Sequence, residues 1–133
     1  MINDLLFVYG TLLDTHNEFG NYLRSNAKFY NSGKFKGRLY DVGEYPGAIT
    51  GTKNDYNIIG DVYRLTSHDA LKAIDDYEGY GDDQHQPNLF IRKLFPVETG
   101  GASADCWVYL YNFPVEGLVE IKSGDYKSYL KQK

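Results

Sequence analysis

The stretch that most constrains the fold is Leu5 to Leu13, which reads LLFVYGTLL. Every residue from Leu5 to Tyr9 is apolar or aromatic, and a run of that length and composition suits a buried strand better than a helix. Gly10 then ends the run, because glycine tolerates backbone angles that a side chain forbids. We therefore predict a buried strand that is followed by a glycine turn.

The polar residues that follow, Asp14 to Glu18, predict the start of a helix. A strand, a glycine turn and a helix start leave backbone N–H groups unpaired and pointing outward. Such groups bind carboxylates, phosphates or developing oxyanions. The alternative is that Gly10 only permits a tight turn, and this stretch alone leaves both interpretations open.

Length and charge narrow the class of protein. The 133 residues predict one domain, 1–133, with a sizeable core. No run of apolar residues is long enough for a membrane span, and we expect no secretory signal. The single cysteine, Cys106, excludes an internal disulfide and fits a reducing, cytoplasmic compartment. The net charge of −4 argues against a nucleic-acid partner, which would require a basic surface.

The order of elements predicts an α+β domain. Thirteen tyrosines, seven phenylalanines and 14 glycines favour β structure with frequent turns. Apolar periodicity predicts helices at 15–25, 67–78 and, at the C-terminal end, from about 124–125. It predicts extended chain or strands at 27–40 (with a turn or bulge at 31–33), 48–50, 57–65, 89–98 and 104–111. We expect a curled sheet or a small mixed β-barrel of about five to seven strands with two or three helices.

Three local signals in this pattern are specific. Thr66 or Ser67 is predicted to cap the central helix, and Gly79 to end it in the left-handed conformation. Gly60, in the middle of its strand, predicts a bulge or the close approach of another backbone or a ligand. Tyr45-Pro46-Gly47 predicts a turn.

Most of the usual catalytic groups have no supporting pattern. Cys106 lies in an apolar strand, where thiols are usually inert, and no serine occupies a nucleophile elbow. His16, His68 and His85 lack the spacing of metal ligands, so we expect no zinc site.

The remaining cluster is acidic: Asp75, Asp76, Glu78, Asp82 and Asp83. A run of this kind usually forms a solvated face. Glu78 differs, because it is predicted in the last turn of a helix between Tyr77 and Gly79. The helix dipole and an aromatic environment would both raise the pKa of its carboxyl group and suit it to general acid–base catalysis. A structural or solvated role for Glu78 stays open at this point.

Taken together, the segments resemble the γ-glutamylcyclotransferase-like family. The matching segments run in order along the chain: VYGTL (8–12), YPG (45–47), GDVY (60–63), LKAIDDYEGY (71–80), FIRKLFPV (90–97), WVYLY (107–111) and SGDYKSYL (123–130). Each fragment alone is weak, whereas the ordered set is specific. The resemblance implies the γ-glutamylcyclotransferase-like fold, a small mixed barrel with surrounding helices.

The resemblance also implies a reaction and a site. The α-amine of a γ-glutamyl group attacks its own γ-carbonyl, which releases 5-oxoproline and a free amine. Glu78 matches the acid–base position, and the turn formed by Tyr9, Gly10, Thr11 and Leu12 matches the anion-binding loop. The partner implied is a small γ-glutamyl compound, with no cofactor, metal, membrane or nucleic acid.

Substrate choice is less defined by the sequence. The YGTL motif in a short chain is similar to the γ-glutamylamine branch, so the substrate is expected to be a γ-glutamyl amine or a γ-glutamyl amino acid. Arg92, Tyr109 and Tyr111 are candidates to line the pocket, and packing within the sheet is an equal alternative for each. The polar loop 81–88 is a candidate cover for the cavity. The alternative function is a non-catalytic binding or interaction domain on the same fold. The sequence leaves the oligomeric state open.

Overall fold

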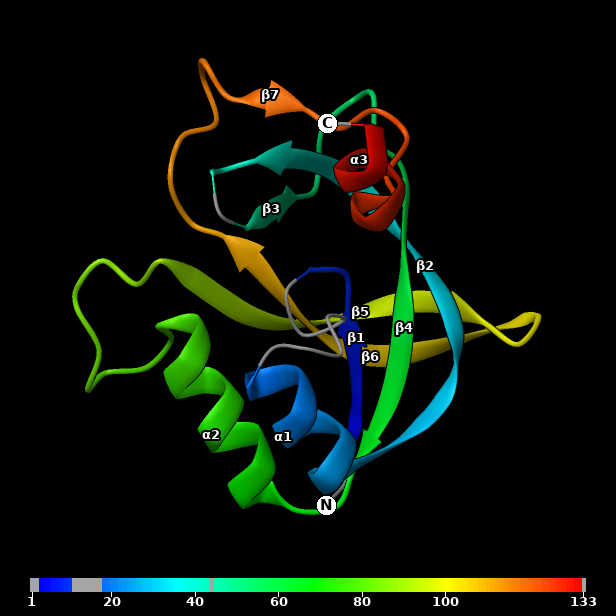
Figure 1. Ribbon diagram of the computed structural model, residues 1–133, viewed down its shortest axis with the longest axis vertical. Helices are drawn as coiled ribbons and strands as arrows, with labels where there is room; N and C mark the ends of the chain where they lie inside the picture. Colours follow the sequence, from blue (N-terminus) through cyan, green and yellow to red (C-terminus); the bar gives the residue numbers. More distant parts are fainter. Residues whose placement is uncertain (1–2, 11–17, 44, 133) are drawn as a thin grey trace.

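The computed structural model describes residues 3–10, 18–43 and 45–132. These residues form seven strands and three helices (Figure 1). The elements follow the order β1 (Leu5–Val8), α1 (Glu18–Asn26), β2 (Ala27–Asp41), β3 (Pro46–Ile49), β4 (Tyr56–Leu65), α2 (His68–Glu78), β5 (Phe90–Thr99), β6 (Ala102–Tyr111), β7 (Val119–Glu120) and α3 (Tyr126–Gln132).

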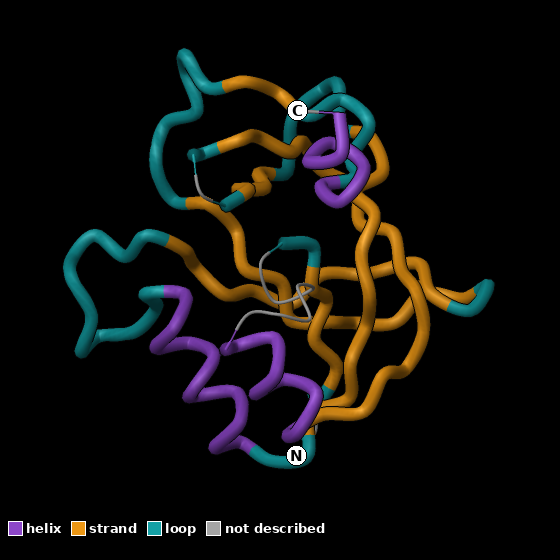
Figure 2. Tube along the Cα trace, in the orientation of Figure 1, coloured by secondary structure: helices purple, strands orange, loops and turns teal. Residues whose placement is uncertain are grey.

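The sheet closes into a barrel. Its strands lie in the order β3-β2-β4-β1-β6-β5, and an additional pairing of β2 with β5 closes the five strands β2, β4, β1, β6 and β5 (Figure 2). The β1–β6 pairing is parallel and the other pairings are antiparallel. Strands β3 and β7 pair with the C-terminal part of β2, outside the barrel. The prediction of a small mixed barrel is therefore confirmed.

Strand β1 is buried on both of its faces, which explains its unbroken apolar sequence. Successive side chains of a strand point to opposite faces. Leu5 and Phe7 belong to the apolar core that also holds Phe35 and Val62, whereas Leu6 and Val8 pack in a second core. That second core contains Leu23 of α1 and Leu71 and Ile74 of α2, so β1 separates the barrel interior from the helices.

Helices α1 and α2 lie side by side against the barrel (Figure 1). The predicted caps of α2 are both present: Ser67 Oγ accepts a hydrogen bond from the Ala70 N–H (3.2 Å), and Gly79 adopts the left-handed conformation with φ 75°. Of the helix predicted at 15–25, the part from Glu18 onward is observed, and residues 15–17 lie outside the described part. The predicted C-terminal helix is α3.

Two glycines are required by close packing. A Cβ atom on Gly60 would lie 2.2 Å from the Val8 carbonyl oxygen, so the predicted close approach of another backbone is confirmed. A Cβ atom on Gly10 would lie 2.8 Å from Pro46 Cγ, and the φ angle of Gly10 is outside the left-handed region. The explanation of Gly10 by unusual backbone angles was therefore wrong, because steric contact with Pro46 is what excludes a side chain.

Two predictions about β2 and β3 need correction. Strand β2 is continuous through residues 31–33, where a turn or bulge was predicted. The shift in its pairing register with β4 lies just before, between Phe29 and Asn31. Pro46 and Gly47 belong to β3 and pair with Asp41 and Tyr40, so the predicted turn precedes them. No helix in the described ranges combines the length and apolar character needed to cross a bilayer.

Candidate active site

A pocket of about 190 Å³ opens where α2 and β1 end. Five segments supply its lining: the end of β1, the start of β3, the end of α2, the start of β5 and the end of β6. Its described lining residues are Phe7, Val8, Tyr9, Gly10, Tyr45, Pro46, Tyr77, Glu78, Leu89, Phe90 and Tyr109. Two segments that the sequence alone could not place together, the Tyr9-Gly10 turn and the end of α2, therefore face one cavity.

Glu78 is the last residue of α2, and it is the charged side chain among the described lining residues. Burial first, and then the negative charge of Asp75, together raise the pKa of its carboxyl from 4.5 to about 8. The direction is the one expected from the sequence, but its first cause is desolvation. A carboxyl with this pKa exchanges its proton near neutral pH, as a general acid–base group must.

Tyr9 forms the opposite wall and is buried. Its hydroxyl donates a hydrogen bond to the main-chain carbonyl of Tyr109 and accepts one from the Ala48 N–H (3.3 Å). Burial first, and then the charge of Glu78, raise the pKa of the Tyr9 hydroxyl well above its usual value. Tyr9 therefore stays neutral, and its two hydrogen bonds fix the chain that leads into Gly10.

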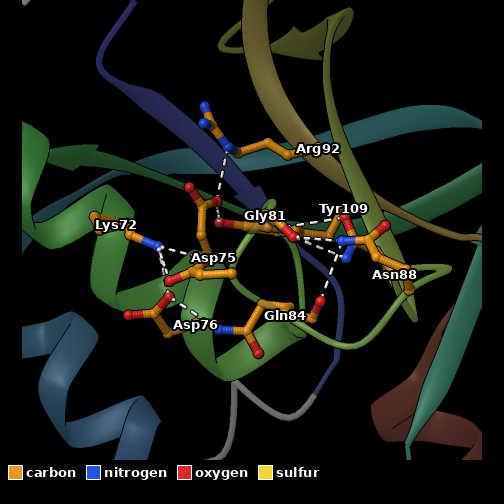
Figure 3. A network of polar contacts seen from close by, with 10 residues as sticks. Lys72, Asp75, Asp76, Gly81, Gln84, Asn88, Arg92 and Tyr109 are labelled. Carbon is orange, nitrogen blue, oxygen red and sulfur yellow. Dashed lines mark hydrogen bonds and ion pairs between the residues drawn. The ribbon is translucent and has the colours of Figure 1, made fainter.

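Tyr109 of β6 connects the pocket to α2. Its hydroxyl donates to Asp75 Oδ1 (2.6 Å), and Figure 3 shows Asp75 reaching toward both Tyr109 and Arg92. Burial, the charge of Asp75 and the hydrogen bond to it hold the pKa of the Tyr109 hydroxyl far above its usual value. The tyrosine is therefore a permanent hydrogen-bond donor, and its ring forms part of the pocket wall.

Comparison with known proteins defines the family. The family model described as gamma-glutamyl cyclotransferase, AIG2-like, matches residues 6–128. The chain belongs to this family. The match includes the end of β1, all of α2 and strands β5 and β6, which together form the pocket.

Relatives of the family cover nearly the whole chain. The gamma-glutamylcyclotransferase family protein YtfP of Escherichia coli K12 is 31% identical over 122 residues, which are 91% of this chain and 94% of that protein. The gamma-L-glutamyl-butirosin B gamma-glutamyl cyclotransferase of Niallia circulans is 31% identical over 128 residues, 96% of this chain and 78% of that protein. The solution structure of the Escherichia coli protein ytfP superposes with a TM-score of 0.68 at 28% identity and covers 97% of this chain and 99% of that one.

The candidate residues of this family member fall into three groups. Tyr9, Gly10, Glu78 and Tyr109 line the pocket, whereas Thr11 and Leu12 lie outside the described residues. Two further candidates are not among the lining residues. Arg92 forms an ion pair with Asp75 behind the wall, with 2.8 Å between Nε and Oδ1.

Tyr111 is the second candidate outside the lining set. Its ring packs edge-on against Phe90 at 5.7 Å between centroids and against Phe113 at 6.0 Å. Phe90 is one of the described lining residues, so the first contact supports the pocket wall. The contacts of Tyr111 are therefore packing contacts, which is the alternative to pocket lining that the sequence left open for this residue.

Asp75 is the residue that sequence reasoning missed. It was grouped with a solvated acidic run, yet it is only 6% exposed. The helical spacing held the signal, because Asp75 lies four residues after buried Leu71 and three before Glu78, on the same side of α2.

The loop 81–88 is held at both ends by Asn88. The side chain of Asn88 binds the start of the loop: Oδ1 accepts a hydrogen bond from the Gly81 N–H (3.1 Å), and Nδ2 donates one to the Gly81 carbonyl (3.0 Å). The main-chain carbonyl of Asn88 accepts a hydrogen bond from Asn112 Nδ2 (2.8 Å). Figure 3 shows Asn88 and Gly81 facing each other. These bonds fix the chain that leads into Leu89 and Phe90 of the pocket. The role of the loop as a cover stays a prediction.

The chemistry available in the pocket is that of one carboxyl group, neutral tyrosines and backbone groups. No Lys, Arg or His side chain is among the described lining residues. Within the described residues, no group of three or more His, Cys, Asp or Glu side chains is placed to hold a metal ion. Proton transfer by Glu78 is therefore the reaction step that the described side chains support best.

Proposed function

We propose that the protein is a γ-glutamyl cyclotransferase that converts a γ-glutamyl amine or γ-glutamyl amino acid into 5-oxoproline and a free amine. One observation carries the proposal: a carboxyl group with a pKa of about 8 lines the same pocket as the Tyr9-Gly10 turn. Membership of the family supports the reaction class.

In the proposed reaction, Glu78 moves one proton. As a carboxylate, it takes a proton from the α-ammonium group of the substrate, which leaves a neutral nucleophilic amine. The amine nitrogen forms a bond to the γ-carbonyl carbon, and the bond from that carbon to the leaving nitrogen breaks. Glu78 then gives its proton to the leaving nitrogen, which restores the carboxylate. The attacking nitrogen loses its second excess proton to the released amine, directly or through water, so the products are neutral-ring 5-oxoproline and a protonated amine, and no external co-reactant is consumed.

The turn after Tyr9 is proposed to hold the anionic groups. Negative charge develops on the γ-carbonyl oxygen in the transition state, and backbone N–H groups stabilise such charge without a basic side chain. The rigid attachment of Tyr9 to Tyr109 and Ala48, and the contact of Gly10 with Pro46, support this assignment because they fix the direction in which the turn leaves β1.

The proposed leaving group is argued from the rest of the pocket lining. Tyr45, Tyr77, Leu89 and Phe90 contribute mainly apolar and aromatic surface to it. The name of the Niallia circulans relative describes a γ-L-glutamyl-butirosin B substrate, and this supports a γ-glutamyl compound for the present chain. We propose that the γ-glutamyl group is the constant part of the substrate and that the amine occupies the aromatic side.

The test is a direct assay for 5-oxoproline. The protein is incubated with matched γ-glutamyl amines and γ-glutamyl amino acids, and the product and free amine are quantified. We expect equal amounts of both products from at least one substrate, and none from α-glutamyl isomers, whose γ-carboxylate cannot be attacked in this way. A folded protein that binds a γ-glutamyl compound but releases no 5-oxoproline would be a binding domain instead.

A further inference from the structure

A second carboxylate lies one helical turn before Glu78, inside the protein. The side chain of Asp75 is only 8% exposed. Its Oδ1 accepts the Tyr109 hydroxyl at 2.6 Å and lies 2.8 Å from Arg92 Nε. Burying a charged pair costs solvation energy that the pair's own attraction often fails to recover, so its presence beside a pocket calls for a role other than stability.

Arg92 is held in place by aromatic rings. Its guanidinium carbon lies 4.3 Å from the centroid of the Trp107 ring and 5.5 Å from that of Tyr80. Cation–π contacts of this kind orient the guanidinium group as well as stabilising it. Arg92 of β5 therefore faces Asp75, and it is not among the described lining residues of the pocket.

Tyr109 extends this arrangement to the opposite wall. Its side chain binds Asp75 on α2, while its main-chain carbonyl accepts the hydroxyl of Tyr9 on β1. One continuous set of contacts therefore runs from Arg92 through Asp75 and Tyr109 to Tyr9, next to Gly10. A change at Asp75 would reach both sides of the pocket, although Asp75 itself is not among the lining residues.

Resting on the function proposed above, we propose that Asp75, with Arg92 and Tyr109, is a positioning residue that sets the protonation of Glu78 and holds the end of α2 against the Tyr9-Gly10 turn. Asp75 and Arg92 are not among the described lining residues, whereas Tyr109 is. They act through Glu78, which carries the proton, and through Tyr9.

The charges around Glu78 fix the expected direction. Asp75 faces it from α2, Tyr9 from β1 and Tyr109 from β6, and Tyr45 and Tyr77 are the other titratable side chains of the described lining. Asp75 supplies the nearby negative charge that raises the pKa of Glu78. Neutralising Asp75 must therefore lower the pKa of Glu78. If Asp75 had only a structural role, its loss would lower the amount of folded protein and leave the titration midpoint of Glu78 unchanged.

The test compares Asp75→Asn with Asp76→Asn. Both variants remove one negative charge from neighbouring positions of α2, but Asp76 is exposed and pairs with Lys72 on the solvent side. The carboxyl carbon of Glu78 is titrated by ¹³C NMR in each protein, with Glu78→Gln to assign its signal. We expect a midpoint about one pH unit lower in Asp75→Asn and an unchanged midpoint in Asp76→Asn.

Because the Asp75→Asn variant leaves Arg92 buried without its partner, it can fail to fold. The double variant Asp75→Asn/Arg92→Gln leaves no unpaired buried charge, and its Glu78 midpoint should also be lower. Equal midpoints in the wild type and either folded variant would overturn the proposal.

The NMR titration needs no substrate, so it separates this proposal from the proposed function. If 5-oxoproline is formed, the acid limb of the kcat/KM pH profile of the Asp75 variant should shift to lower pH by the same amount as the NMR midpoint of Glu78. If no substrate is turned over but the midpoint moves, the coupling of Asp75 to Glu78 stands and the cyclotransferase assignment fails.

Discussion

The two faces of α2 carry the same kinds of side chain in opposite environments. On the inner face, Asp75 is buried and pairs with half-buried Arg92, and half-buried Glu78 lines the pocket. On the outer face, Asp76 pairs with Lys72 at 2.8 Å, with 48% and 55% of their side chains exposed (Figure 3). Asp75 and Glu78 are only three positions apart in the sequence, and Asp76 lies between them.

The difference shows that solvation, rather than residue type, decides which carboxylates can do chemistry. Water screens the outer charges, so the ion pairs of Lys72 with Asp76 and Asp83 form without strongly coupling to the rest of the fold. On the inner face, burial raises the pKa of Glu78 to about 8. The same helix therefore carries a solvated face and, on its inner face, the carboxyl group that we propose transfers the proton.

The largest expected effect is a difference in enzymatic activity between variants of the inner face and the outer face of α2. Glu78→Gln should lower kcat/KM for 5-oxoproline formation by about 10²–10⁴-fold, because the amide cannot take or give the proton. Asp76→Asn is the matched control and should keep the wild-type rate. The measurement is product formation by both folded variants. A fully active Glu78→Gln variant would remove Glu78 from the mechanism and with it the functional contrast between the faces.

The second effect is a pH dependence of stability. The pKa of Glu78 is about 4.5 in the unfolded chain and about 8 in the folded protein. At any pH between these two values, Glu78 is ionised in the unfolded chain and protonated in the folded protein. Its contribution is therefore fully present below pH 4.5 and is lost as pH rises through 8, with an upper limit of about 5 kcal/mol.

Urea unfolding of the wild type and Glu78→Gln at pH 5, 7 and 9 measures this contribution. The free energy of unfolding of the wild type should fall relative to that of the variant as pH rises, because glutamine does not ionise. All other titrating groups are common to the two proteins. Parallel pH profiles would mean that Glu78 titrates normally, like a residue of the outer face.

The sequence predicted elements whose causes are local. Ser67 and Gly79 bound α2 because a side-chain oxygen and a left-handed glycine satisfy free backbone groups wherever a helix has such ends. The alternation of β6 was also readable: Cys106, Val108 and Leu110 face one core, and Tyr109 belongs to the other.

What the sequence could not supply is the distance between segments far apart in the chain. Gly10 is required because Pro46 packs against it, and no local pattern contains that contact. Arg92 was a candidate to line the pocket, but it forms an ion pair with Asp75 on α2. That pairing depends on how α2 lies against β5, which the order of elements leaves undetermined.

A smaller effect is expected at Tyr109, which connects the inner face to the barrel. Tyr109→Phe keeps the ring and removes the hydroxyl that donates to Asp75, so it should cost about 1–2 kcal/mol of unfolding free energy. Tyr111→Phe on the same strand is the control, since the Tyr111 hydroxyl makes no hydrogen bond within the described part of the chain. Urea titration measures both. Equal losses would show that the Asp75 contact contributes nothing to stability.

The smallest effect should come from the outer face, where Lys72 contacts Asp76 at 2.8 Å and Asp83 at 3.1 Å. The two carboxylates raise the pKa of Lys72, and Lys72 lowers the pKa of Asp83. Both pKa shifts have the direction expected for ion pairs. Because the groups are exposed, Lys72→Gln should change Tm by about 2 °C or less, and 1 M salt should remove that difference. The rate of 5-oxoproline formation should not change. A loss of activity in this variant would show that the outer charges act on Glu78 through the helix, and the separation of the two faces of α2 would then fail.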